Sequence, residues 1–165
     1  MAENGFVRPA ERGDAAAIGL VHHTAWQETY TGLIAQSFLD ARTVTRSTAM
    51  AEREWPHMSV AVWDGRVVGF CGCGEARDKD LCGAGEIQGI YLLRAYQRHG
   101  LGRALLEDGL RRLRAAGYSS AYLWVLSTNE NARRFYEKNG FAPDGAEKTE
   151  ILGEPITEMR YVRKL

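Results

Sequence analysis

The residues with the clearest chemical meaning form the hexapeptide Gln97–Gly102, which reads QRHGLG. It follows an extended apolar run, Ile87 to Leu93, and opens a run with helical spacing, Leu101 to Ala116. The first amides of a helix have no partner within the helix, and the helix dipole places partial positive charge there. Glycines let backbone N–H groups approach a bulky anion. The loop therefore predicts a site for a phosphorylated ligand, with positive charge added by Arg94, Arg98 and Arg103.

The segment Gln97–Gly102, the glycine loop, is also compatible with roles other than a phosphate site. Glycine also marks ordinary strand-to-helix turns, so a purely structural role is the alternative. The loop is not a Walker A motif, because no Gly-Lys-Ser/Thr follows. A full Rossmann fingerprint is excluded too, since the third glycine is missing and no strand ends in an acidic residue about 20 positions later. The hexapeptide alone leaves a phosphate site and a structural turn both open.

Length and composition predict one soluble domain over residues 1–165. Apolar residues make up 45% and charged residues 25%, which is ordinary for a globular protein. Lys plus Arg and Asp plus Glu are 21 each, so no bulk charge favours nucleic acid or an anionic membrane. No apolar run is long enough for a membrane span, and Met1 to Arg8 lacks the apolar core of a signal peptide. We expect a cytoplasmic protein with neither nucleic acid nor membrane as partner.

The three cysteines, Cys71, Cys73 and Cys82, do not fit a disulfide scaffold, because their number is small and odd. The spacing of Cys71 and Cys73 is too short for a common zinc knuckle, and no histidine lies at a ligand spacing. Alternation along a strand places both on one face, where cysteine packs as a small apolar residue. The sequence therefore predicts no metal site.

The elements that must position the loop follow from hydrophobic periodicity and turn residues. Asp14 is a suitable N-cap for the first helix, Asp64-Gly65 is a hairpin signal, and Gly117 and Gly140 each end a helix. Strands are predicted at 6–8, 59–63, 66–73, 86–93 and 121–126, then near Phe141 and in a closing hairpin of 150–152 with 157–162. Helices are predicted from Asp14 to about Tyr30, over 38–53, over 101–116 and over 130–139. This order gives a mixed α/β sheet with helices on both faces.

Two segments resemble the conserved motifs of one enzyme family. The strand Glu86–Leu92 and the loop after it resemble the central motif of the GNAT superfamily of N-acetyltransferases, Gln/Arg-x-x-Gly-x-Gly/Ala after the fourth strand. Asn129–Phe141 resembles the next motif, Asn-x-x-Ala followed by Phe-Tyr-Glu-Lys-x-Gly-Phe. Val7–Ala10 and Thr29–Leu33 match further segments of the family, so the resemblance covers essentially the whole chain.

The resemblance implies a GNAT fold and acetyl-CoA as co-substrate, without a metal. The fold is a six- to seven-stranded, mixed, largely antiparallel sheet in which strands four and five splay apart. The pantetheine arm would pair with Ile90 and Leu92 as a false strand, and an N–H of Ile90 or Tyr91 would face the thioester carbonyl. Asn129 would contact the arm, or only cap a helix. The implied donor-site residues are Ile90, Tyr91, Leu92, Gln97, Arg98, His99, Gly100, Leu101, Gly102, Arg103, Asn129 and Ala132.

The implied reaction is direct attack of an amine on the thioester. Tyr136 matches the family's usual acid for the departing thiolate, and its alternative role is that of a core aromatic residue. Glu86 matches the strand-four glutamate that serves as base in some members. It could instead be solvated or ion-paired, with Gln88 or a water as substitute. No cysteine lies at a motif position, so we expect no covalent acetyl-enzyme.

The acceptor pocket should come from the first two helices, their connecting loop and the closing hairpin. Trp26 and Tyr30 are candidate substrate contacts together with Gln88, while Trp26 and the neighbouring His22 could simply pack the helix face. We expect a small-molecule primary amine as acceptor. The alternatives are a protein N-terminus or lysine, a non-catalytic acyl-CoA-binding module and an unrelated nucleotide-binding protein. A homodimer through an edge strand at 157–161 is a further expectation.

Overall fold

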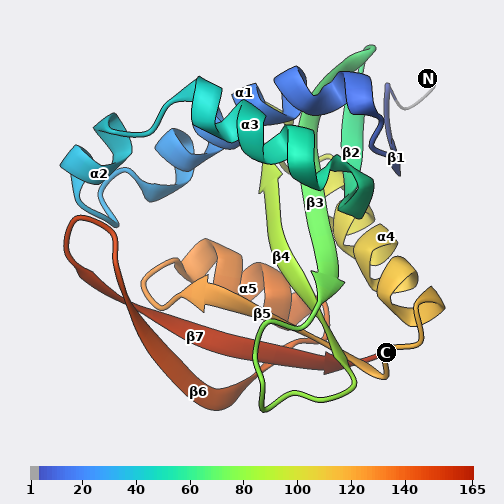
Figure 1. The fold of residues 1–165 in the computed structure, drawn as a ribbon, viewed down its shortest axis with the longest axis vertical. Coiled ribbons are helices and arrows are strands. Elements are labelled where there is room, and N and C mark those ends of the chain that lie inside the picture. Colours follow the sequence, from blue (N-terminus) through green and yellow to red (C-terminus); the bar gives the residue numbers. More distant parts are fainter. Residues whose placement is uncertain (1–3) are drawn as a thin grey trace.

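The computed structural model describes residues 4–165, which form a seven-stranded mixed sheet with helices on both faces (Figure 1). The sheet order is β1-β2-β3-β4-β5-β7-β6; β4 and β5 run parallel, and the other neighbouring pairs are antiparallel. The strands are β1 (Gly5–Pro9), β2 (Met58–Trp63), β3 (Arg66–Glu75), β4 (Ala84–Leu92), β5 (Ser120–Leu126), β6 (Ala142–Ile151) and β7 (Pro155–Lys164). The fold class predicted from the sequence is confirmed.

Five α-helices and three short 3-10 turns connect the strands of the described chain. The α-helices are α1 (Ala15–Tyr30), α2 (Gln36–Asp40), α3 (Val44–Glu54), α4 (Leu101–Ala115) and α5 (Glu130–Lys138). The 3-10 turns are η1 (Arg12–Asp14), η2 (Trp55–His57) and η3 (Arg94–Tyr96). Within residues 4–165 no helix is both long enough and apolar enough to cross a membrane. The expectation for Met1 to Arg8 falls partly on residues 1–3, which lie outside the described residues.

Three sequence predictions are corrected by the structure. Asp14 precedes α1 but does not cap it with its side chain, because its carboxylate accepts hydrogen bonds from Arg8 and the Glu11 N–H instead. The single helical region predicted over 38–53 is two helices, because the chain breaks after α2 and Thr43 caps α3 by accepting the Arg46 N–H at 3.2 Å. The segment 157–161 is not an edge, because β7 pairs with β5 on one side and β6 on the other. The edge strand at this end of the sheet is β6. Whether the protein dimerises stays a prediction.

The two faces of the sheet have separate cores. One core lies under α4 and α5, and the leucines at helical spacing along α4 are buried there together with Cys71 and Cys73. The other core lies under α1 and α3 against β2 and β3. At Gly19 an added Cβ would lie 2.6 Å from the Thr48 backbone, so this glycine lets α1 approach α3 closely. The packing fixes α1, which carries part of the site.

The centre of the sheet opens between β4 and β5. The two strands pair only at Ala84–Ser120, Gly85–Ala121 and Glu86–Tyr122, and they separate beyond that point. A register shift between Gly72 and Cys73 on β3 accompanies the opening, opposite Gln88. The predicted splay of strands four and five is therefore present. It exposes one edge of β4 inside the protein.

Candidate active site

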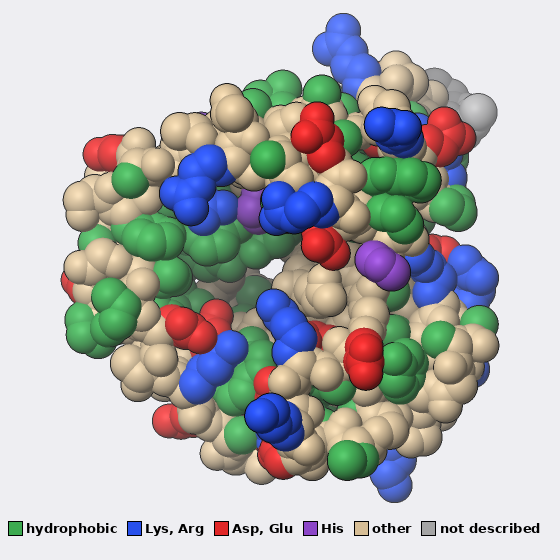
Figure 2. All heavy atoms as spheres, viewed as in Figure 1, with side chains coloured by type: hydrophobic (Ala, Val, Ile, Leu, Met, Phe, Trp, Pro, Cys, Tyr) green, Lys and Arg blue, Asp and Glu red, His purple; other side chains and the backbone are tan. Residues whose placement is uncertain are grey.

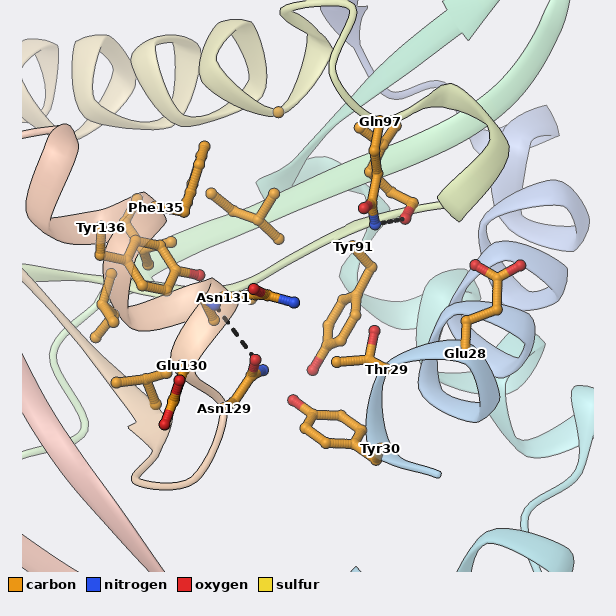
Figure 3. A pocket seen from close by; sticks show the side chains of 18 of the residues that line it. Glu28, Thr29, Tyr30, Tyr91, Gln97, Asn129, Glu130, Asn131, Phe135 and Tyr136 are labelled. Atoms are coloured by element: carbon orange, nitrogen blue, oxygen red, sulfur yellow. Dashed lines mark hydrogen bonds between the residues drawn. The ribbon is translucent and has the colours of Figure 1, made fainter. Parts of the chain in front are cut away.

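A cleft of about 740 Å³ follows the gap between β4 and β5. Its walls come from the end of α1, from β4, from the loop before α4 and from α5 (Figure 3). Ten of the twelve predicted donor-site residues line it: Ile90, Tyr91, Leu92, Gln97, Arg98, Gly100, Gly102, Arg103, Asn129 and Ala132. The other two do not. His99 packs on the Trp63 ring at 5.0 Å between centroids, and Leu101 is buried in the core.

The glycine loop takes the backbone shape that an anion site needs. Gly100 is the N-cap of α4 with φ of 83°, and Arg98 also has a positive φ of 65°. Left-handed residues of this kind turn successive N–H groups toward one side of the chain, and the unpaired amides at the start of α4 add to them. The side-chain amide of Gln97 donates to the Leu92 carbonyl at 3.2 Å, which holds the loop against the end of β4. Arg98 and Arg103 supply positive charge at the cleft.

The exposed edge of β4 carries free backbone groups toward the gap. The Leu93 N–H donates to the Val68 carbonyl at 3.0 Å, so Leu93 points its backbone groups toward β3. Backbone groups alternate along an antiparallel pair, which directs Tyr91 toward β3 as well. Ile90 and Leu92 therefore direct their N–H and carbonyl groups into the gap, where the Leu92 carbonyl already accepts the Gln97 side-chain amide. This is the edge that an extended ligand arm can pair with.

The end of α1 is tied to the glycine loop. Glu28 accepts the Arg94 N–H at 2.7 Å, and its carbonyl accepts a second hydrogen bond from the Arg94 guanidinium. Both residues line the cleft, as Thr29 and Tyr30 do. Helix α1 and the glycine loop thus form one continuous rim.

Tyr136 enters the cleft from the opposite side. Asn129 caps α5 by accepting the Ala132 N–H at 3.3 Å, which sets the direction of the helix. In Figure 3 the Tyr136 side chain points from α5 into the cleft. Only 9% of the residue is exposed, and burial raises the pKa of its hydroxyl well above the usual value. The group is therefore a protonated donor at neutral pH.

A smaller pocket of about 160 Å³ lies on the other side of the gap. Four residues line both spaces, Tyr30, Gln88, Tyr91 and Trp124, so the two spaces meet there. The space-filling view is hollowed near its centre, where the ribbon view shows β4 and β5 apart (Figures 1 and 2). The remaining lining residues are Trp26, Arg77, Glu86, Leu126, Lys148, Leu152 and Glu158.

Glu86 lines the smaller pocket, but it is fully engaged there. Arg77 donates to both carboxylate oxygens, at 2.5 and 2.8 Å, and the Tyr122 hydroxyl donates to one of them at 3.0 Å. Only 1% of Glu86 is exposed, whereas 67% of the Arg77 side chain is. This is the ion-paired alternative that the sequence left open. Base chemistry at Glu86 requires a movement of Arg77 or a relaying water.

Trp26 and Tyr30 line the smaller pocket from α1, and their role as substrate contacts stays a prediction. Trp26 contacts Tyr30 at 4.6 Å between ring centroids and lies under the Arg42 guanidinium. Its indole N–H is buried and has no hydrogen-bond partner among the residues described. His22 lines neither space; burial lowers its pKa to about 4, and it supports the pocket by contacting Trp26 and Tyr91 edge-on.

The sequence did not single out four pocket residues: Arg77, Trp124, Lys148 and Glu158. Trp124 lies in a strand predicted to be buried, yet its position next to the splay leaves the indole facing both spaces. The alternation of the strand and the implied splay were signals for it. Lys148 and Glu158 come from β6 and β7, and their register could not be read from the sequence. None of the cysteines lines either space.

Known proteins match both the sequence and the fold. The model of the acetyltransferase (GNAT) family matches residues 21–141. An uncharacterized N-acetyltransferase of Bacillus subtilis, YuaI, is 32% identical over 161 residues, covering 93% of this chain and 89% of that protein.

Solved structures agree in fold. The PaiA N-acetyltransferase of Thermoplasma acidophilum, in complex with coenzyme A, has a TM-score of 0.80 at 18% identity and covers 98% of this chain and 99% of its own. YncA of Salmonella typhimurium, a putative acetyltransferase with its cofactor acetyl-CoA, has a TM-score of 0.76 at 21% identity, with 98% and 94% covered. The chain belongs to the GNAT family and is an acyl-CoA-dependent acetyltransferase.

Proposed function

We propose that the protein transfers the acetyl group of acetyl-CoA to a primary amine of a compact small molecule, by direct attack within a ternary complex. The observation that carries this proposal is the meeting of two spaces in one gap. The larger holds a buried tyrosine hydroxyl, and the smaller holds a carboxylate. Two reactants bound on opposite sides of the gap would be held together without a covalent intermediate.

The donor would lie along the larger cleft. Its pyrophosphate fits the amides of residues 98–103, where the helix dipole and the two loop arginines favour an anion. Its pantetheine arm fits the free edge of β4, pairing with Ile90 and Leu92. The alternation of β4 favours the Ile90 N–H over that of Tyr91 for the thioester oxyanion. These contacts would place the thioester close to the junction of the two spaces.

The chemistry needs two protons removed from the acceptor nitrogen and one supplied to the thiolate. An alkylammonium has a pKa of about 10, so the acceptor must lose a proton before its nitrogen attacks the carbonyl carbon. Glu86 would take that proton through a water, or directly after Arg77 has moved. The C–N bond then forms, the C–S bond breaks, and the Tyr136 hydroxyl protonates the departing thiolate. The nitrogen loses its second proton, which restores the Tyr136 hydroxyl, and the proton held by Glu86 passes to solvent.

The smaller pocket favours a compact acceptor. Its volume of about 160 Å³ suits a small amine, and side chains from α1, β5 and the β6–β7 hairpin close around it. Its two carboxylates, Glu86 and Glu158, each have a basic partner, so the pocket has no uncompensated negative charge for a polycationic segment. A protein N-terminus or lysine is the second candidate acceptor, and a binding module without turnover is the third.

The test is a turnover screen with purified protein, acetyl-CoA, a panel of small primary amines and lysine-containing peptides. Mass spectrometry of the acetylated product and release of free CoA are the two readouts. We expect acetylation of small amines in preference to peptides. Peptide acetylation alone would overturn the acceptor class. Acetyl-CoA binding without turnover of any amine would favour the binding module.

A further inference from the structure

We propose that Glu158 and the ring face of Trp124 form the subsite that receives the ammonium group of the acceptor, and that Lys148 occupies this subsite until the acceptor displaces it. The proposal rests on the proposed function, because it assigns the acceptor side of that site. The ligand class is a compact primary alkylammonium.

The first observation is that a primary ammonium already lies in the pocket. The Lys148 Nζ is 4.6 Å from the centroid of the Trp124 ring and 3.3 Å from a Glu158 oxygen. A carboxylate beside an aromatic face is a favourable environment for a cation. The chemical group held there is the same as the reacting group of the proposed acceptor. Lys148 therefore marks where such a group is stabilised.

The second observation is that the two pocket carboxylates differ in availability. Glu86 is fully buried and engaged by Arg77 and Tyr122. Glu158 keeps 24% of its side chain exposed, and within the described chain its ion-pair partner is Lys148, itself 37% exposed. An incoming ammonium can replace the partly exposed Lys148 at Glu158 without leaving a buried charge unpaired. Glu158 is thus the carboxylate that an acceptor reaches first.

The third observation concerns the walls. Trp26, Tyr30 and Tyr91 line the same pocket and connect it to the donor cleft. These aromatic side chains give part of the pocket an apolar wall, which suits the alkyl part of a compact amine. Aromatic walls and an exchangeable ion pair together describe a binding site for an alkylammonium.

The chain offers a matched control for Glu158. Lys148 also contacts Glu150, at 3.5 Å, but Glu150 does not line the pocket. Glu158→Gln and Glu150→Gln each remove one carboxylate from Lys148, and only the first removes it from the subsite. Circular dichroism would check that both variants fold.

The direct test is a displacement experiment by NMR. The sequence has four lysines, Lys79, Lys138, Lys148 and Lys164. A protein with ¹³C-dimethylated lysines therefore gives few NMR signals, and the signal that disappears in Lys148→Arg belongs to Lys148. We expect n-butylammonium to shift the Lys148 signal saturably while the other three stay fixed, and the uncharged n-butanol to leave it unchanged. An unmoved Lys148 signal, or an equal shift by n-butanol, would overturn the proposal.

Kinetics with n-butylamine provide the second arm. Glu158→Gln should raise the KM for the amine by about tenfold or more, since a charged hydrogen bond is lost, with a smaller change in kcat. Glu150→Gln should leave the KM within about twofold. Equal effects of the two variants would overturn the subsite. Displacement of Lys148 without turnover by the wild-type protein would instead overturn the proposed function and leave the subsite standing.

Discussion

The two sides of the β4–β5 gap differ in the chemical groups that face them, backbone atoms on one side and side chains on the other. On the proposed donor side the groups that face the cleft include backbone atoms: the amides of the glycine loop and the outward-facing edge of β4. On the acceptor side they are side chains from α1, β4, β5, β6 and β7, arranged in ion pairs and aromatic contacts. Backbone recognition survives most changes of side chain. The donor side is therefore suited to one constant ligand, and the acceptor side to a ligand that can change as side chains change.

The largest expected effect concerns the Tyr136 hydroxyl, which lines the larger cleft. Tyr136→Phe should lower kcat by about 100-fold or more, because it removes the proposed acid, while acetyl-CoA affinity stays within about twofold. Steady-state rates and calorimetric titration measure the two quantities. Tyr118→Phe, outside both spaces, is the control. An unchanged kcat in Tyr136→Phe would remove this residue from the chemistry.

We expect the protein to lose stability in mild acid because of His22, which contacts Trp26 and Tyr91 in the wall of the smaller pocket. Burial lowers its folded pKa to about 4, below the value of about 6.5 in an unfolded chain, so the unfolded state binds more protons between these pH values. The free energy of unfolding should fall by up to about 3 kcal/mol as the pH drops from 6.5 to 4.

Denaturant unfolding over this pH range measures the effect. His22→Gln should flatten the dependence, whereas His57→Gln, at an exposed histidine, should keep it. The same slope in His22→Gln and the wild type would contradict the assignment to His22.

The backbone character of the donor side can be tested at Gly100. Gly100→Val should raise the Kd for acetyl-CoA by about tenfold or more, because a β-branched residue disfavours the φ of 83° on which the loop depends. Gly117→Val is the matched control: its φ is 93°, and at both positions an added Cβ has no neighbour within 4 Å. Both variants should lose about 1–3 kcal/mol of stability. A comparable loss of binding in both would show a general effect of strain.

The smallest expected effect is a difference in stability cost between two ion pairs of the smaller pocket, Lys148–Glu158 and Arg77–Glu86. Lys148→Met should change the free energy of unfolding by less than about 1 kcal/mol, since that pair is partly exposed. Arg77→Met should cost about 2 kcal/mol, because it leaves the buried Glu86 carboxylate with Tyr122 as its remaining side-chain partner. Chemical denaturation compares the two. Equal costs would mean that Glu86 is not held by Arg77.

The difference between the two sides of the gap also explains which parts of the site could be predicted from the sequence. The glycine loop, the α4 leucines and the N-cap at Asn129 are local patterns, and the structure contains each of them. The break between α2 and α3 was missed because its signal, the cap at Thr43, lies inside a run with helical spacing. The position of β7 inside the sheet and the pairing of Lys148 with Glu158 depend on contacts between distant segments. The donor side was therefore largely predictable, and most of the acceptor side was not.

The central claim is that donor and acceptor bind on opposite sides of one gap at the same time. Initial rates measured over a grid of acetyl-CoA and amine concentrations test it most directly. Simultaneous binding predicts double-reciprocal lines that intersect, with no acetylated protein detected in the absence of amine. Parallel lines together with an acetylated enzyme would contradict the claim, because they would show that the acetyl group passes through the protein before the acceptor binds.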